Sequence, residues 1–149
     1  MRAVVQRVAW AEVEVDGRVV GRIGKGLLVY VGVGVDDGPA EADWLAGKLA
    51  GLRIFTDREG KLNLSVKAVG GAVLAISNFT LLADARKGRR PAFTAAAAAE
   101  QAEPVHEAFL AALRQQGVDV QTGVFGAKMA IRSQADGPVN IIVDSPKSR

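Results

Sequence analysis

The sequence has no cysteine and a single histidine, His106, and these two scarcities exclude several kinds of chemistry. Without cysteine there is no disulfide, no thiol nucleophile and no thiolate metal site. With one histidine, a metal site built from several imidazoles is excluded as well. A carboxylate-only Mg²⁺ site is compatible with the composition, but no motif indicates one, and we expect neither a metal nor a cofactor.

Long apolar runs are also missing, since no stretch approaches the roughly 18 residues that a membrane-spanning helix needs. Near the N-terminus, Gln6 and Arg7 interrupt the apolar residues, and Glu12 and Glu14 follow, which is unlike a secretory signal. We therefore expect a cytoplasmic protein with no membrane partner.

What remains is the composition of an ordinary globular protein, with 49% hydrophobic and 23% charged residues. A length of 149 residues is enough for one domain with a substantial core. We predict a single domain over residues 1–149, in which 147–149 form a flexible tail. The net charge of +3 and the pI near 9.5 permit an acidic partner such as RNA without requiring one.

The first half of the chain is predicted to hold strands and one helix. Alternating apolar residues and an Asp16-Gly17 hairpin signal indicate strands near the start. The nearly continuous apolar run 27–35 predicts a central strand covered on both faces. An acidic cap at 36–37, with Pro39 in the first turn, indicates a helix that reaches Leu52. Residues 53–66 then suggest a short strand, a turn and an irregular arm.

The second half repeats this order of strand, helix and strands. A buried strand is predicted at 72–77, followed by a basic loop at 83–92. A long helix is predicted from Thr94 or Ala95 to Gln116, with Thr94 as N-cap and Pro104 as a kink or break. Closing strands are predicted at 118–121, 128–134 and 139–143. The whole indicates an α/β or α+β domain in which mixed and antiparallel sheets pack with two main helices.

Two candidate sites can be read from single residues or short runs. Ser77, His106 and an aspartate would supply a hydrolytic triad, but no Gly-x-Ser-x-Gly elbow surrounds Ser77. The mid-helix position of His106 is typical of a surface or half-buried helix residue. The cations Arg86, Lys87, Arg89 and Arg90 form either a solvated loop or a set of phosphate contacts. No aromatic residue interleaves with them, which argues against a stacking platform for single-stranded nucleic acid.

Two further motifs are uninformative alone but specific together. Ser77-Asn78-Phe79-Thr80 ends a buried strand, and Gly137-Pro138 lies between two apolar runs. With other segments in order along the chain, they resemble the D-aminoacyl-tRNA deacylases over residues 1–146. The matching segments are residues 5–8, 26–29, 32–33, 53–55, 60–64, 77–81, 88–93, 121–126 and 136–139.

The resemblance implies hydrolysis of the ester that joins a D-amino acid to the 3′-terminal adenosine of tRNA, as chiral proofreading in translation. Glycine mischarged on tRNA(Ala) is expected to be released too, because it has no side chain to exclude. The resemblance also implies a homodimer whose Gly137-Pro138 peptide is cis and reaches into the partner's active site. That corner would collide with an L side chain, and its carbonyls would hold the substrate's amino group.

The resemblance assigns roles to other residues. Ser77, Asn78, Phe79 and Thr80 form the catalytic tract, with backbone N–H groups near Phe79 and Thr80 lining the ester and the RNA 2′-hydroxyl assisting. A second interpretation makes Thr80 the nucleophile. Pocket and loop residues are Phe125, Met129, Arg7 and Asn140, with Arg7 bracing the Gly-Pro loop. Arg86, Lys87, Arg89 and Arg90 become candidate tRNA phosphate contacts.

Two positions depart from the family pattern. Asn78 stands where glutamine is usual, and Asn140 stands where threonine is usual. We expect activity to survive with an altered rate or altered discrimination. The alternative that these changes leave open is a catalytically impaired tRNA-binding module of the same fold.

Overall fold

The computed structural model describes residues 1–146, so the predicted tail at 147–149 lies outside the described residues. The strands are β1 (Arg2–Val15), β2 (Arg18–Ile23), β3 (Gly26–Gly32), β4 (Phe55–Thr56), β5 (Leu62–Leu64), β6 (Ala72–Ser77), β7 (Asp119–Thr122) and β8 (Ala130–Asp144). The helices are α1 (Pro39–Gly51), α2 (Ala99–Gln115) and the short 3₁₀ helix η1 (Phe79–Leu82). Neither α-helix in this range is long and apolar enough to span a membrane.

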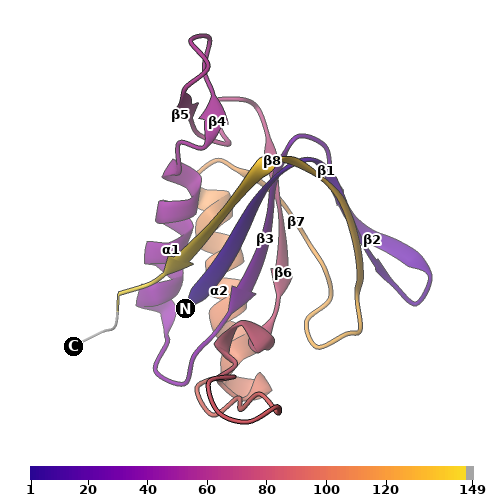
Figure 1. The fold of residues 1–149 in the computed structure, drawn as a ribbon, viewed down its shortest axis with the longest axis vertical. Helices are drawn as coiled ribbons and strands as arrows, with labels where there is room; N and C mark the ends of the chain where they lie inside the picture. Colours follow the sequence, from indigo (N-terminus) through magenta and orange to yellow (C-terminus); the bar gives the residue numbers. More distant parts are fainter. Residues whose placement is uncertain (147–149) are drawn as a thin grey trace.

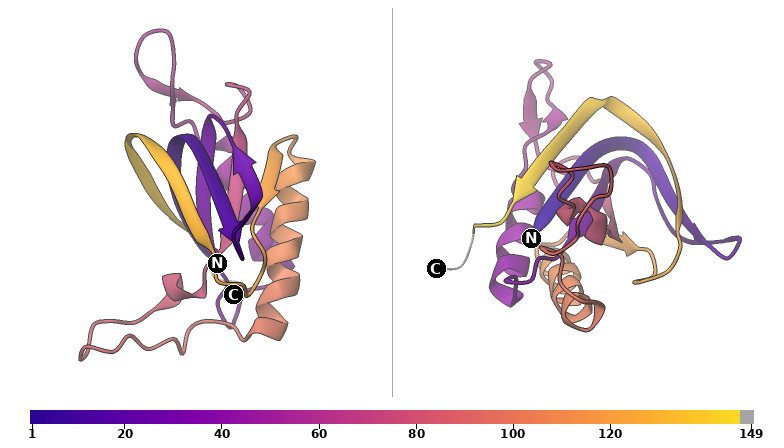
Figure 2. Two further views of the ribbon diagram at one scale, coloured as in Figure 1. Left: turned by 90° about the vertical axis from the view of Figure 1, so that its right-hand side faces the viewer. Right: turned by 60° about the horizontal axis from the view of Figure 1, so that its bottom comes forward.

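One mixed, six-stranded sheet organises the molecule and confirms the predicted fold class. Its order is β2-β1-β3-β6-β7, and β8 pairs with β1. The β3–β6 and β6–β7 pairs are parallel, and the other pairs in this sheet are antiparallel. Both α-helices cover one face of the sheet, and within the sheet β1 and β8 run side by side as long, arched strands (Figure 1; Figure 2, right). A small separate hairpin, β4–β5, projects beyond the helices (Figure 1).

The central strands are buried on both faces, as the apolar run predicted. Leu27 and Val29 of β3 belong to the larger hydrophobic cluster, which includes the inner faces of both helices. Leu28, between them, belongs to a second cluster on the opposite face of the sheet. Alternate side chains of a strand point to opposite faces, so an unbroken apolar run is the sequence of a strand with two dry faces.

The predicted start of the second helix is wrong. Residues 95–98 are not helical, and α2 begins at Ala99. Val35 N–H donates to Ala95 O at 3.1 Å, and Ala97 N–H donates to Val33 O at 2.9 Å. These bonds tie the alanine run to the chain after β3, so tertiary pairing overrides the helical preference of alanine. Thr94 is therefore not the cap, and Pro104 lies inside one uninterrupted helix.

The two closing strands predicted at 128–134 and 139–143 are one strand, β8. Gly137-Pro138 is not a turn between them but part of an insertion within the strand. In the pairing with β1, Gln6 faces Asn140 and Val8 faces Ala135, so residues 136–139 stand opposite Arg7. We call residues 136–139 the Gly-Pro bulge. Bulges of this kind re-aim the chain without ending the sheet, which is why two short apolar runs read as separate strands.

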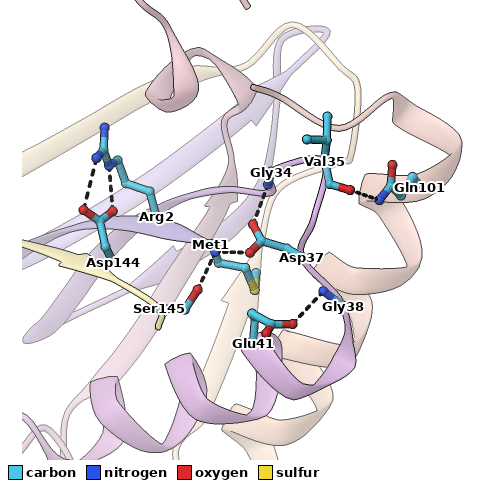
Figure 3. Close-up of polar contacts among 10 residues, drawn as sticks. All are labelled: Met1, Arg2, Gly34, Val35, Asp37, Gly38, Glu41, Gln101, Asp144 and Ser145. Atoms are coloured by element: carbon cyan, nitrogen blue, oxygen red, sulfur yellow. Dashed lines mark hydrogen bonds and ion pairs between the residues drawn. The ribbon is translucent and has the colours of Figure 1, made fainter. Parts of the chain in front are cut away.

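The ends of the described chain meet in a polar cluster beside α1 (Figure 3). The Met1 ammonium pairs with the Asp37 carboxylate at 2.5 Å and donates to Ser145 Oγ at 2.5 Å. The other Asp37 oxygen accepts the Gly34 N–H at 2.6 Å. At the start of α1, Glu41 accepts the N–H of Gly38, the capping residue, at 2.9 Å. The predicted acidic cap is thus wrong in detail, because Asp37 holds the chain terminus and not the helix.

Candidate active site

A cavity of about 610 Å³ opens where β3 and β6 end. These strands are parallel, so their carboxyl ends lie at the same edge of the sheet, where open α/β sheets usually bind ligands. The wall is completed by the first turns of α2 and by the segment that precedes β8. The lining residues are Tyr30, Val31, Val33, Ile76, Ser77, Asn78, Phe79, Ala97, Ala99, Ala102, His106, Phe125, Gly126, Ala127, Met129 and Ile131. The sequence-based candidates Ser77, Asn78, Phe79, Phe125 and Met129 therefore do come together.

Asn78 makes the turn at the edge of this cavity. Its N–H donates to Val31 O at 2.8 Å, which anchors it to the neighbouring strand. Its side-chain Oδ1 accepts the Thr80 N–H at 3.2 Å and the Thr80 hydroxyl at 2.5 Å. Asn78 is thus the N-cap of η1, a role for which the short asparagine side chain is well suited.

Among the described residues, this capping leaves the Phe79 amide as the free donor of the tract. Phe79 is the first residue of η1, and the first amides of a helix have no intrahelical acceptor. The Thr80 N–H is already bound to Asn78. Thr80 is exposed and lies outside the cavity lining, whereas Phe79 lines it. Of the two amides predicted to face the ester, only that of Phe79 is available.

His106 is buried and not the surface or half-buried residue that its helical position indicated. Only 2% of it is exposed, and it lies beside Phe109 and Phe125. Burial lowers the pKa of its imidazole from 6.5 to about 4, so the ring is neutral at pH 7. Within residues 1–146, its Nδ1 has no hydrogen-bond partner. A triad needs a carboxylate on one imidazole nitrogen and a hydroxyl on the other. Although Ser77 and His106 line the same cavity, the described residues do not assemble one.

Arg7 joins the Gly-Pro bulge to the base of the β4–β5 hairpin. Its Nε donates to Asp136 O at 2.9 Å, and its Nη1 donates to Ile54 O at 2.9 Å. The Asp136 carboxylate lies 3.3 Å from the same Nε. The Arg7 side chain is 11% exposed, whereas that of Asp136 is 49% exposed. The predicted contact between Arg7 and this loop is therefore present.

The Gly-Pro bulge itself is remote from the cavity of its own chain. The Gly137–Pro138 peptide bond is cis. Gly137, Pro138 and Asn140 are exposed, and none of them lines the cavity; nor does Arg7. Asn140 pairs with Gln6 at the edge of the bulge. One chain therefore divides the sequence-based site into two separate parts.

The basic loop has one internal ion pair and three other cations. Arg86 donates to both carboxylate oxygens of Asp84, at 2.9 and 2.7 Å. This pairing lowers the pKa of the Asp84 carboxyl, through hydrogen bonds from the Arg86 side chain and backbone. Lys87, Arg89 and Arg90 are exposed.

Sequence reasoning misplaced one residue of the cavity and missed two others around it. His106 was found but misplaced, and Tyr30 was taken only as part of an apolar strand. Tyr30 is half-buried and lines the cavity, and burial raises the pKa of its phenol. A polar-tipped aromatic inside an apolar run was the available signal. Phe93 follows the basic loop, and its ring centroid lies 5.1 Å from that of Phe79. No local sequence signal places these two rings together.

Comparison with known proteins identifies the family. The sequence profile described as D-Tyr-tRNA(Tyr) deacylase matches residues 4–144. This chain belongs to the D-Tyr-tRNA(Tyr) deacylase family. A family relative, the D-aminoacyl-tRNA deacylase of Anaeromyxobacter dehalogenans, is 58% identical over 145 residues, which cover 97% of each chain. Another, from Thermus aquaticus, is 54% identical over 145 residues, covering 97% of this chain and 95% of the relative.

Two solved structures share this fold over nearly the whole chain. A structure named c-Myc DNA unwinding element binding protein superposes with a TM-score of 0.91 at 39% identity, covering 98% of this chain and 99% of that one. A probable eukaryotic D-amino acid tRNA deacylase superposes with a TM-score of 0.82 at 20% identity, covering 95% and 97%. At 20% identity, the second structure shows a shared fold and nothing more.

Proposed function

We propose that this protein hydrolyses the ester bond of D-aminoacyl-tRNA and releases the free D-amino acid and tRNA. The observation that carries the proposal is the full-length similarity, at 58% identity, to a protein named for this activity. Such similarity does not favour the alternative of a catalytically impaired tRNA-binding module. We also propose that the protein acts in the cytoplasm, where aminoacyl-tRNA is made and used.

The cavity suggests how the ester is cleaved. Water attacks the ester carbonyl carbon, negative charge grows on the carbonyl oxygen, and the acyl–O3′ bond then breaks as the 3′-oxygen takes a proton. We assign the Phe79 amide as donor to the growing oxyanion, as backbone amides act in other acyl-transfer sites, because Phe79 lines the cavity and begins η1. The neutral, unoriented imidazole of His106 is a poor base, so the proton relay falls to the substrate's own 2′-hydroxyl and to water.

In this proposal, a second copy of the chain distinguishes D- from L-amino acids on the tRNA. The Gly-Pro bulge is exposed and does not line the cavity of its own chain, which leaves it available to another. In a homodimer, each bulge closes the partner's cavity, and the carbonyls near Gly137 and Pro138 accept hydrogen bonds from the substrate's protonated amino group. An L side chain collides with this wall. Glycine has no side chain, so glycine mischarged on tRNA(Ala) is released as well.

The tRNA body is held by the basic loop. Lys87, Arg89 and Arg90 are exposed cations suited to phosphate contacts, which supply affinity without reading sequence. Arg86 contributes less, because its ion pair with Asp84 already offsets its charge.

The proposal is tested by incubating the purified protein with D-tyrosyl-tRNA and L-tyrosyl-tRNA in the presence of a chelator. We expect release of D-tyrosine, with L-tyrosyl-tRNA spared, because no step draws on a metal. Intact D-tyrosyl-tRNA after incubation, under conditions where the Thermus aquaticus relative cleaves it, would refute the proposal. Equal cleavage of the two enantiomers would refute the role of the bulge.

A further inference from the structure

An exposed pair of aromatic rings stands at the rim of the cavity. Phe79 lines the cavity, yet 56% of it is exposed, which is unusual for a phenylalanine. The ring of Phe93 supports it from the side, with centroids 5.1 Å apart and planes at 66°. This edge-to-face arrangement fixes the orientation of the Phe79 ring and leaves a large apolar surface facing solvent.

The same pair sits at the base of the basic loop. Asp84 N–H donates to Ala92 O at 2.7 Å, and Ala92 N–H donates to Asp84 O at 2.9 Å, which closes the loop at its neck. Phe93 follows that neck directly, and η1, which contains Phe79, ends shortly before it. The segment after η1 extends away from the sheet (Figure 2, left). One segment, residues 79–93, thus carries three exposed cations and two rings, and the fold brings the two rings at its ends into contact.

Proteins bind single-stranded nucleic acid with exposed aromatic rings and nearby exposed cations. Bases stack on the rings whatever their sequence, and the cations follow the phosphates. A cavity of about 610 Å³ is in the range that holds one small ligand. If the terminal adenosine and its amino acid occupy it, the nucleotide before them must cross the rim, where Phe79 lies.

We propose that Phe79 and Phe93 form a stacking platform for the nucleotide immediately 5′ of the terminal adenosine, while Lys87, Arg89 and Arg90 follow the backbone of the single-stranded 3′ end. This inference rests on the proposed function, since tRNA is the occupant. It assigns the Phe79 side chain a binding role that is separate from the role of its amide. It also replaces the sequence-based argument that no aromatic residue accompanies the basic run.

The test uses an uncharged RNA hairpin with a single-stranded 3′ end, in which 2-aminopurine replaces the penultimate base. Because the RNA carries no amino acid, the measurement does not depend on hydrolysis. Stacking quenches 2-aminopurine, so we expect quenching at saturation with the wild-type protein. Phe79→Leu and Phe93→Leu should abolish the quenching and weaken binding about tenfold. Phe79→Tyr should preserve both.

Two comparisons separate stacking from charge and from general damage. Trp44→Leu removes an exposed aromatic on α1 that does not line the cavity, and should change neither quenching nor affinity. Arg89→Gln with Arg90→Gln should weaken binding and its salt dependence, while the complex still quenches at saturation. Unquenched fluorescence in the saturated wild-type complex, or full quenching with Phe79→Leu, would overturn the platform even if D-tyrosyl-tRNA is cleaved. A platform that quenches without any cleavage would instead count against the proposed function.

Discussion

The hydroxyl of Thr80 donates to Oδ1 of Asn78 at 2.5 Å, and the same oxygen accepts the Thr80 N–H at 3.2 Å. A nucleophilic hydroxyl needs a base that removes its proton. Here the proton of Thr80 is held by an amide oxygen, which is not a base, and the residue lies outside the cavity lining. The two hydrogen bonds between Asn78 and Thr80 therefore stabilise the turn that contains the Phe79 amide.

Thr80→Ala is therefore expected to slow hydrolysis modestly. It removes one hydrogen bond of about 1 kcal/mol, so the rate constant for D-tyrosyl-tRNA under single-turnover conditions should fall about fivefold. Thr80→Ser, which keeps the hydroxyl, should stay near wild type. Complete loss of cleavage in a folded Thr80→Ala protein would restore the threonine as nucleophile.

Arg7 is expected to control selectivity more than rate. Arg7→Gln removes donors to Asp136 and Ile54, so the Gly-Pro bulge loses its fixed position. Cleavage of L-tyrosyl-tRNA should rise relative to D-tyrosyl-tRNA, measured as the ratio of kcat/KM values. Arg132→Gln is the matched control, since Arg132 lies on β8, the strand that carries the bulge, but its half-exposed side chain pairs with Glu12 and Glu14. An unchanged ratio in Arg7→Gln would show that the bulge does not depend on this contact.

His106 should make the fold sensitive to mild acid. Its pKa is about 4 in the folded protein and 6.5 in the unfolded chain, so unfolding takes up a proton between these values. The free energy of unfolding should therefore fall as the pH drops from 6.5 towards 4, by about 3 kcal/mol from this group at about 1.4 kcal/mol for each pKa unit. Carboxylates titrate in the same range, so the measured quantity is the difference between wild type and His106→Phe in urea.

That difference should grow in favour of His106→Phe as the pH falls and should be constant above pH 7. A difference that is the same at every pH would mean that the imidazole titrates normally. His106→Phe should also keep hydrolysing D-tyrosyl-tRNA at pH 7. Loss of that activity in the folded variant would support the esterase that pairs Ser77 with His106.

Asp37 should stabilise the fold through the chain terminus. Asp37→Asn leaves the partly buried Met1 ammonium without its carboxylate at 2.5 Å. We expect a loss of about 2 kcal/mol in the free energy of unfolding, the size of a hydrogen bond to a charged group. Asp36→Asn alters the exposed neighbouring carboxylate and should have little effect. Equal urea midpoints for the two variants would contradict the importance of the pair.

Strands with two buried faces were the easiest elements to predict, because a short unbroken apolar run indicates a strand whose two faces are both covered. Leu28 and Leu74 come from such runs, and both belong to the second cluster. The alanine run was mispredicted because its local preference is helical, whereas its hydrogen bonds come from residues some 60 positions earlier, at Val33 and Val35. Local helical propensity does not depend on hydrogen-bond partners so distant in sequence.

The candidate site was predicted in part for the same reason. Residues next to one another in sequence, such as Asn78 and Phe79, were placed correctly at the end of their strand. The burial of His106 and the contact of Phe79 with Phe93 depend on how helix and loop pack, and no periodicity encodes them. The family resemblance singled out the Gly-Pro motif as functional. The position of this motif within a strand followed only from the register of β8 with β1.

The two separated halves of the site lead to a test of complementation between subunits. Pro138→Arg should disable the Gly-Pro bulge by placing bulk and positive charge before the substrate's protonated amino group. Ala99→Trp should fill the cavity from its exposed rim, at the first residue of α2. Each variant alone should leave D-tyrosyl-tRNA intact. When the two variants are unfolded together and refolded, some dimers contain one subunit of each kind. Such a mixed dimer holds one site made from an unaltered cavity and the other subunit's unaltered bulge, so cleavage should return.

If the bulge served its own chain, every site in the mixture would carry one lesion and the mixture would stay inactive. Mixing the folded homodimers without refolding provides the control, and a monomeric mass for the wild-type protein at micromolar concentration would remove the basis of the shared site altogether.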